Sequence, residues 1–162
     1  MTLHTPDAPV LTSNRVTVCR GPVSFDDVVA VARHDARVVI DADSLAEVRR
    51  TRIVIEALAD DQQPHYGVST GFGALATRHI PVALRAQLQR SLVRSHAAGS
   101  GAEVEREVVR ALMLLRISTL ATGRTGISET TLQAYVGMLN AGLTPVVHEY
   151  GSLGCSGDLA PL

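Results

Sequence analysis

A serine set among small residues is the first candidate for chemistry. Ser156 follows Cys155 and precedes Gly157 and Asp158, within the stretch GSLGCSGDLAPL that closes the sequence. The nucleophile elbow of a serine hydrolase needs glycine two residues after the serine, and Asp158 stands there instead. Taken alone, Ser156 is typical of a helix N-cap, because its hydroxyl can accept from backbone N–H groups of the first turn.

A glycine-rich loop is the second candidate, YGVSTGFG, which begins at Tyr66. Gly71, Gly73 and Ala76 match the G-x-G-x-x-A dinucleotide fingerprint. The residues before them do not form a buried strand, and no carboxylate follows at the required distance, so a dinucleotide site is disfavoured. We expect instead that Gly67 and these two glycines let the backbone turn tightly. Without a chemical role, Tyr66 would be a half-buried tyrosine whose hydroxyl is hydrogen-bonded.

Histidines supply the remaining candidates. His96 ends an apolar helical face, where a histidine is more often a hydrogen-bonded structural group than a ligand. His148 and Glu149 are adjacent, but no third ligand is spaced to join them in a metal site. The two cysteines lie far apart and fit neither a metal motif nor a disulfide framework. We therefore expect no metal in this protein.

Composition narrows the class of protein. Hydrophobic residues make up 46% of the chain and aromatic residues 3%, which predicts an aliphatic core. The net charge of −1 and the absence of a dense basic face argue against nucleic-acid binding. Every cationic residue is arginine, so no lysine of this chain can hold pyridoxal phosphate. The N-terminus lacks a signal peptide and no apolar run could span a membrane, so we expect a cytoplasmic protein.

The elements that must position these residues are mainly helical. Ser24 with Asp27, and Ser44 with Glu47, resemble capping boxes that open helices. The packed face of the second helix is predicted to include Ile53, and that of a later helix Leu84, Leu88, Leu92 and His96. The pattern predicts short strands at 16–20 and 37–41, a loop at 61–78, and helices from 24, at 44–59, 81–97 and 103–122, and from 128 to about 141.

Glycines and prolines suggest how the chain is divided. Residues 1–15 read as a flexible tail, and residues 16–100 as an N-terminal domain that carries the Tyr66 loop. Residues 101–162 read as the start of a central helical domain, whose first helix is expected to carry three glutamates in its N-terminal turns. Pro145 forbids helix in the stretch before Tyr150, which is expected to be extended.

Read together, these stretches resemble the N-terminal part of the aromatic amino-acid ammonia-lyase family, and its histidine-specific members in particular. The resemblance runs from about residue 16 to the last residue. It implies a bundle of long helices of the aspartase/fumarase-like architecture, of which this chain would be a truncated part. The motifs occur in the family's order: YGVSTGFG, SHAAG at 95–99, LNAGLTPVVHEYGSLG at 139–154 and CSGDLAPL at 155–162.

The resemblance implies a cofactor made from the chain itself. In this family an X-Ser-Gly triad cyclises to 4-methylideneimidazole-5-one (MIO), and here the triad would be Cys155, Ser156 and Gly157. The nitrogen of Gly157 attacks the carbonyl carbon of Cys155, and the ring and the Ser156 hydroxyl each lose water. Most relatives carry alanine where Cys155 stands, but that residue supplies only backbone atoms. Asp158 is a candidate to assist the proton transfers, and no metal or pyridoxal phosphate is implied.

The resemblance also assigns the substrate contacts. Tyr66 matches the tyrosine that removes the β-proton, although a free tyrosine hydroxyl ionises only at about pH 10 and would need nearby positive potential. Ser95 and His96 match the pair found in histidine-specific members, which implies L-histidine as substrate and trans-urocanate as product. Ser69 and Ser91 depart from the asparagines of many relatives, which leaves details of the loop and of substrate contacts open.

Two alternatives stay open. A lyase or aminomutase of the same family could act on tyrosine or phenylalanine, although Ser95 and His96 argue against it. The chain could also be a non-catalytic truncated domain, since the family's active sites draw on later helices and on neighbouring subunits of a homotetramer. We expect the isolated 162-residue segment to be inactive.

Overall fold

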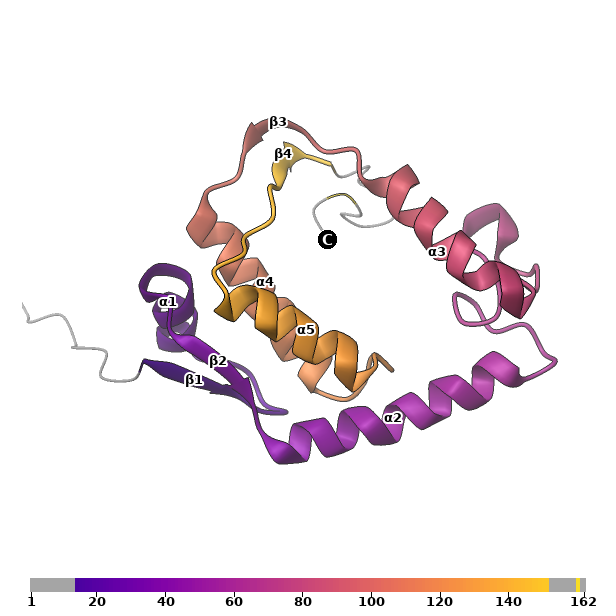
Figure 1. The fold of residues 1–162 in the computed structure, drawn as a ribbon, viewed down its shortest axis with the longest axis horizontal. Helices are drawn as coiled ribbons and strands as arrows, with labels where there is room; N and C mark the ends of the chain where they lie inside the picture. Colours follow the sequence, from indigo (N-terminus) through magenta and orange to yellow (C-terminus); the bar gives the residue numbers. More distant parts are fainter. Residues whose placement is uncertain (1–13, 152–159, 161–162) are drawn as a thin grey trace, which may run out of the picture.

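The computed structural model describes residues 14–151 and residue 160, and its elements follow one another around an open ring (Figure 1). Helix α2 forms one side, α3 the next, a small two-stranded sheet closes the corner, and α4 with α5 form the opposite side. The elements are β1 (Arg15–Val18), α1 (Phe25–His34), β2 (Arg37–Ile40), α2 (Ala42–Asp60), the 3₁₀ turn η1 (Gly73–Leu75), α3 (Val82–His96), β3 (Ser100–Glu103), α4 (Arg106–Ala121), α5 (Glu129–Asn140) and β4 (His148–Tyr150).

The first unit is a strand–helix–strand crossover. Strands β1 and β2 pair in parallel, with Val16 opposite Val38. Helix α1 between them begins at the predicted capping box, where Ser24 Oγ accepts from the Asp27 N–H at 3.1 Å and the Asp27 carboxylate accepts from the Ser24 N–H at 3.0 Å. The box satisfies two backbone donors that the first turn cannot pair, which fixes the start of the helix.

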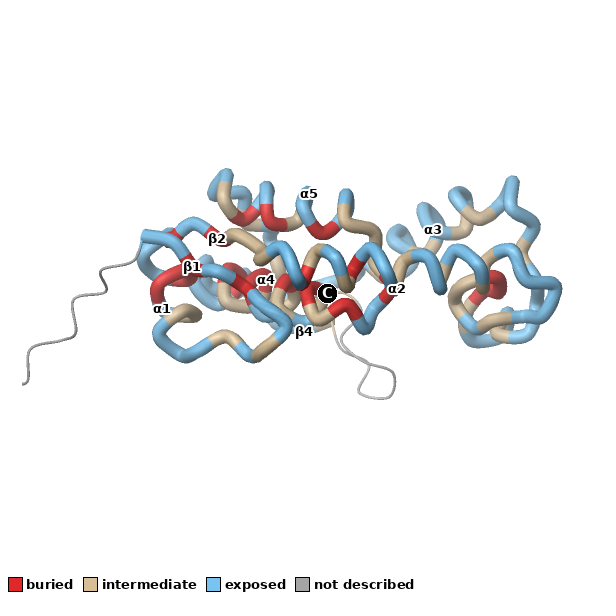
Figure 2. Tube along the Cα trace, turned by 90° about the horizontal axis from the view of Figure 1, so that it is seen from below, coloured by how far each residue is buried: buried red, intermediate tan, exposed pale blue. Residues whose placement is uncertain are grey.

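The core lies between this crossover and the helices α4 and α5. Its largest buried aliphatic side chains come from α4, where Met113, Leu114 and Ile117 are fully covered, and from α5, where Leu132 and Leu139 are. Helix α1 and helix α5 both pack against α4. Figure 2 shows buried positions concentrated here, while α3 has no buried residue and is exposed or intermediate along its length. The prediction of a buried helix from the apolar centre of 103–122 is confirmed.

The N-cap of the second helix lies three residues before the predicted one. Its N-cap is Asp41, whose carboxylate accepts from the Ser44 N–H at 3.0 Å. Ser44 therefore lies inside the first turn, and its hydroxyl is buried without a hydrogen-bond partner. Glu47 forms an ion pair with Arg50 instead of capping. The prediction was wrong because aspartate caps a helix as well as serine does, and Asp41 comes first.

One residue in each of two predicted helical faces is exposed, and one helix start differs. Ile53 is 67% exposed, and Leu84 is 50% exposed at the start of α3, a helix that buries none of its residues in this chain. The other positions predicted for the α3 face, Leu88, Leu92 and His96, are partly buried. Glu103 belongs to β3, so that only Glu107 of the three glutamates lies in the first turn of α4. Helical spacing predicts which residues share a face, but it does not say whether another element covers that face.

Strands β3 and β4 form a two-stranded sheet between segments whose pairing was not predicted from the sequence. The two strands are antiparallel, with Ser100 opposite Tyr150, and a register shift interrupts them. Gly101 makes the close approach possible, because its φ is +88° and a Cβ there would lie 2.5 Å from the Tyr150 ring. The stretch before Tyr150 was predicted to be extended but not to be paired.

The described chain is mainly helical with short strands, as predicted. The expected tail at 1–15 lies outside the described residues up to residue 13, and Arg15 belongs to β1. The division near residue 100 stays a prediction. None of the helices described combines the length and the hydropathy needed to span a bilayer.

Candidate functional site

Tyr66 stands on a compact loop between α2 and α3. The carbonyl oxygen of His65 accepts from the backbone N–H groups of Val68, Ser69 and Thr70, at 3.0, 3.0 and 3.3 Å. Three donors converging on one oxygen wind the chain into a tight turn directly after Tyr66. This turn fixes the backbone that carries the tyrosine.

Two buried hydroxyl groups hold the inside of this loop. Ser69 Oγ accepts from the His65 N–H at 2.9 Å, and Thr70 Oγ1 accepts from the Gly67 N–H at 3.2 Å. Both side chains are at least 98% buried. The Ser69 carbonyl oxygen accepts from the Ile80 N–H at 2.8 Å, which joins the two arms of the loop. Ser69 thus bonds within the loop itself.

Glycines permit this path. Gly67 has φ +71°, and a Cβ there would meet the Phe72 ring at 3.0 Å. A Cβ at Gly71 would lie 2.6 Å from that of Leu75. Gly73 has φ +56° but open space around it. At these three positions glycine is favoured by close packing, by a left-handed backbone, or by both.

The Tyr66 side chain points outward from the loop. It is 65% exposed, and its ring meets Phe72 edge to face, with centroids 5.7 Å apart and planes at 87°. Within the described part of the chain its hydroxyl forms no hydrogen bond. This is not the half-buried, hydrogen-bonded tyrosine that a purely structural role predicts.

His96 ends α3 with one ring nitrogen already engaged. Its Nδ1 lies 2.8 Å from the carbonyl oxygen of Leu92 and 2.8 Å from Ser95 Oγ. A carbonyl oxygen only accepts, so we infer that Nδ1 carries the proton. In a neutral imidazole the other nitrogen, Nε2, is then an acceptor. His96 is half-buried and could receive a hydrogen bond from a ligand.

Tyr66 and His96 lie at opposite ends of α3, and the His96 end lies near the segment that contains His148. Tyr66 precedes α3 and His96 is its last residue, and no hydrogen bond or ring contact joins them among the described residues. The pairing of β3 with β4 brings Gly99 next to His148: a Cβ at Gly99 would lie 3.2 Å from that of His148. The segment leading to the triad thus passes close to the His96 end of α3. Cys155, Ser156, Gly157 and Asp158 lie outside the described residues.

A metal centre is the other kind of site that the histidines could form. Across residues 14–151, no three histidine, cysteine, aspartate or glutamate side chains form a group that could hold a metal ion. His148 Nδ1 instead lies 3.0 Å from the Gly101 carbonyl oxygen.

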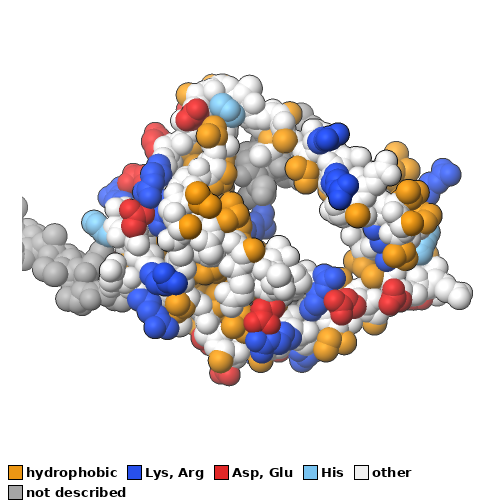
Figure 3. Space-filling model, viewed as in Figure 1, with side chains coloured by type: hydrophobic (Ala, Val, Ile, Leu, Met, Phe, Trp, Pro, Cys, Tyr) orange, Lys and Arg blue, Asp and Glu red, His pale blue; other side chains and the backbone are white. Residues whose placement is uncertain are grey.

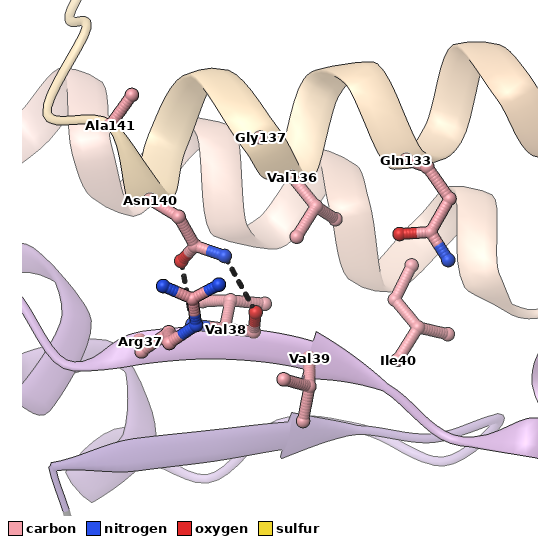
Figure 4. A pocket seen from close by; sticks show the side chains of 9 residues that line it. All are labelled: Arg37, Val38, Val39, Ile40, Gln133, Val136, Gly137, Asn140 and Ala141. Atoms are coloured by element: carbon pink, nitrogen blue, oxygen red, sulfur yellow. Dashed lines mark hydrogen bonds between the residues drawn. The ribbon is translucent and has the colours of Figure 1, made fainter.

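An open pocket of about 560 Å³ lies between β2 and α5. In Figure 4, Asn140 points from α5 to the backbone of Val38, donating and accepting at 2.8 Å. This amide occupies part of the free edge of β2, and the pocket includes neither Tyr66 nor His96.

Comparison with known proteins decides the family. The profile of the aromatic amino acid lyase family matches residues 23–162. The chain belongs to the aromatic amino acid lyase family. Histidine ammonia-lyase of Streptomyces griseus is 60% identical over 91% of the chain. The chain spans 29% of the length of that lyase.

Solved structures of the aromatic amino acid lyase family share the fold of this chain. Histidine ammonia-lyase of Trypanosoma cruzi matches with a TM-score of 0.80 and 32% identity, over 91% of this chain and 28% of that one. Tyrosine aminomutase of Streptomyces globisporus matches with a TM-score of 0.83 and 35% identity, over 91% of this chain and 27% of that one. A histidine ammonia-lyase and a tyrosine aminomutase thus share this part of the fold.

Proposed function

We propose that the full-length protein eliminates ammonia from L-histidine to give trans-urocanate. The observation that carries this proposal is the 60% identity with a histidine ammonia-lyase over 91% of the chain. Tyrosine aminomutase is 35% identical over the same share. Because the chain spans under a third of these relatives, the activity is proposed for the whole protein.

The residue types at the triad suit MIO. Gly157 offers a backbone nitrogen without a neighbouring Cβ, and Ser156 offers a hydroxyl that can leave as water. Cys155 contributes only backbone atoms, so its side chain does not prevent ring closure. Once formed, the ring supplies an electrophile that turns the substrate amine into a better leaving group. Asp158 is proposed to assist the proton transfers of ring closure.

Tyr66 is the proposed base that removes the β-proton. Its hydroxyl is exposed and has no hydrogen-bond partner in the described part of the chain, so it is available to a substrate. The turn at His65 and the glycines at 67 and 71 hold the backbone beneath it. A base held on a rigid loop loses little freedom when the substrate arrives, which lowers the barrier to proton transfer.

His96 is the proposed contact for the substrate imidazole. With Nδ1 donating to Leu92, Nε2 accepts, and the N–H of a neutral substrate imidazole is the matching donor. A phenyl ring offers no such donor, so it would leave a desolvated Nε2 without a partner. This difference favours histidine over phenylalanine as substrate.

The first test is turnover by the full-length protein. Urocanate formation from L-histidine, followed by its absorbance, supports the proposal, and activity on tyrosine alone contradicts it. The intact mass should be lower than the sequence mass by two waters, and an unmodified mass in an active enzyme excludes MIO. Ser156→Ala should abolish turnover while leaving the fold intact.

Tyr66→Phe tests the base separately from the cofactor. Removing one hydroxyl should lower kcat by about 10²–10⁴-fold, with a much smaller change in KM, because the group acts in the transition state. The variant should still show the mass loss of two waters. Unchanged kcat in this variant contradicts the role of Tyr66.

A tyrosine-directed reaction is the second candidate, favoured by the TM-score of 0.83 with tyrosine aminomutase. Turnover of L-tyrosine and L-phenylalanine, assayed beside L-histidine, decides between the two.

We further propose that the full-length enzyme is a homotetramer with a long-helix bundle, and that the 162 residues alone do not turn over substrate.

A further inference from the structure

Arg85, in the first turn of α3, joins the two ends of the Tyr66 loop. Its Nη2 donates to the carbonyl oxygen of Ala59 at 2.8 Å, and its Nε donates to that of Ile80 at 3.2 Å. Ala59 lies in the last turn of α2, before the loop, and Ile80 lies after it. A single guanidinium therefore spans the neck of the loop, which its planar fork of donors allows.

The charge of Arg85 suits this position. The last turn of a helix leaves carbonyl groups unpaired and carries partial negative charge. Helix α2 has no basic residue in its own last turn. Arg85 supplies the missing cation from the next helix, so the contact is electrostatic as well as geometric.

Beyond this neck the loop is held by its own bonds. The His65 carbonyl, the Ser69 hydroxyl and the Thr70 hydroxyl all bond within residues 63–71. A loop that is rigid inside moves as one body, and its placement is then set where it is attached. The Ile80 N–H, which donates to the Ser69 carbonyl oxygen, links the body of the loop to its neck. Arg85 ties both sides of that neck to the first turn of α3, the helix that ends at His96.

We propose that Arg85 is a positioning residue for the reaction, which fixes the Tyr66 loop relative to α3 and so sets the reach of the Tyr66 hydroxyl. This inference rests on the proposed function, in which Tyr66 is the base. Arg85 touches neither substrate nor reacting atoms in this account. It acts only through Tyr66, and that property separates it from a residue that merely stabilises the fold.

A double-mutant cycle in the full-length protein tests this dependence. Arg85→Met should lower kcat for L-histidine by about 10–100-fold, because a displacement of about 1 Å can cost a factor of 10². KM should change by less than about threefold, since α3 keeps His96 in place. In the Tyr66→Phe background, Arg85→Met should lower kcat by no more than about twofold, because the hydroxyl that it positions is already gone.

Two further variants keep the result interpretable. Arg85→Lys keeps the charge but offers no planar fork, so its kcat should fall between those of the wild type and Arg85→Met. Arg90→Met, at an exposed position of the same helix, should match the wild type. Hydrogen–deuterium exchange of the peptide covering residues 62–75 should be faster in Arg85→Met than in Arg90→Met, and this readout does not depend on turnover.

The outcomes separate this inference from the proposed function. A wild-type protein without lyase activity refutes the function, while the exchange experiment still decides whether Arg85 holds the loop. An active wild type with an unchanged Arg85→Met refutes the positioning role. An equal loss of kcat in both backgrounds also refutes it, since a general structural defect does not require the Tyr66 hydroxyl.

Discussion

At the scale of single residues, the tautomer of His96 determines which hydrogen bond its proposed contact with the substrate can form. The Leu92 carbonyl oxygen accepts from Nδ1 and so leaves Nε2 as an acceptor. A carbonyl of the same helix, one turn back, thus sets the hydrogen-bonding character of the proposed contact. The sequence pair Ser95-His96 shows the residue types, but not which nitrogen is free.

His96→Leu should raise KM for L-histidine by roughly tenfold in the full-length enzyme, the value of one hydrogen bond of about 1.4 kcal/mol. His96→Gln keeps a polar group near the position of Nε2 and should lose less. His34→Leu, at an exposed histidine of α1, is the matched control and should leave KM unchanged. Steady-state kinetics measure all three, and an unaltered KM in His96→Leu would contradict the proposed contact between His96 and the substrate.

At the scale of elements, the Tyr66 loop shows why glycine is needed at particular places. Gly67 combines a left-handed backbone with a ring 3.0 Å from its missing Cβ. Gly137, inside α5, has neither constraint, because a Cβ there meets nothing within 4 Å. The same substitution should therefore have opposite effects at the two positions.

Gly67→Ala should destabilise the protein by about 1 kcal/mol or more, because alanine disfavours φ +71°. It should also lower kcat, since the loop carries Tyr66. Gly137→Ala should stabilise α5 by up to about 1 kcal/mol through helix propensity. Urea unfolding followed by circular dichroism compares the two, and equal stabilities of both variants would contradict the strain assigned to Gly67.

A charged cluster joins α1 to α4 and α5. Arg110 is buried on α4, and it donates to the carbonyl oxygens of Val31 and Leu139 at 3.1 Å each. Burial lowers the pKa of its guanidinium. Asp35 lies 3.0 Å from Arg110 and accepts from Arg106 at 2.8 Å, at a position with φ +54°. This arrangement ties the ends of α1 and α5 to α4.

Asp35 gives the cluster a dependence on pH. The hydrogen bond from Arg106 lowers the pKa of the Asp35 carboxyl, despite some desolvation, with help from the charge of Arg110. The unfolded chain therefore binds more protons near pH 4 than the folded one, so this stabilisation is present above that pH and is lost as pH falls further.

Asp35→Asn should lower the free energy of unfolding at pH 7, and the difference from the wild type should shrink below about pH 4. Asparagine tolerates the left-handed backbone at this position, so the substitution removes charge without adding strain. Urea unfolding at several pH values measures this. A difference that is constant with pH would show that the carboxylate charge is not the cause.

At the scale of the whole molecule, the chain is an open ring with one well-packed side. The space-filling view shows an opening through its middle, with hydrophobic side chains on the surrounding surface (Figure 3). On the side away from the core, α3 buries none of its residues within this chain. Val82 and Val93 of that helix are 71% and 66% exposed.

The purified 162-residue chain should form no urocanate under conditions in which the full-length protein does. It spans 29% of the length of the relative it matches at 60% identity, and Tyr66 and His96 share no contact in the described structure. Urocanate absorbance measures the difference between the two proteins. Turnover by the short chain would show that 162 residues hold a complete site.

Local interactions explain what could be predicted from the sequence. The Ser24 and Asp27 box was confirmed, and the helix predicted from residue 128 begins there with Ser128 as its N-cap, because a cap depends on residues three apart. The buried helix was predictable because its apolar centre must be covered by some other element. Where two caps competed, at Asp41 and Ser44, the sequence alone favoured the wrong one.

The sequence by itself determined the family motifs and the residue types that could form an electrophile, act as a base and contact an imidazole. Only the tertiary structure decided the exposure of Tyr66 and the hydrogen-bond partners of His96 and Arg85. The Nδ1 bond of His96, the pairing of β3 with β4 and the reach of Arg85 across the loop neck all depend on where backbone carbonyls lie in space. Every residue has the same backbone carbonyl, so the sequence does not show which carbonyl will lie beside a given side chain.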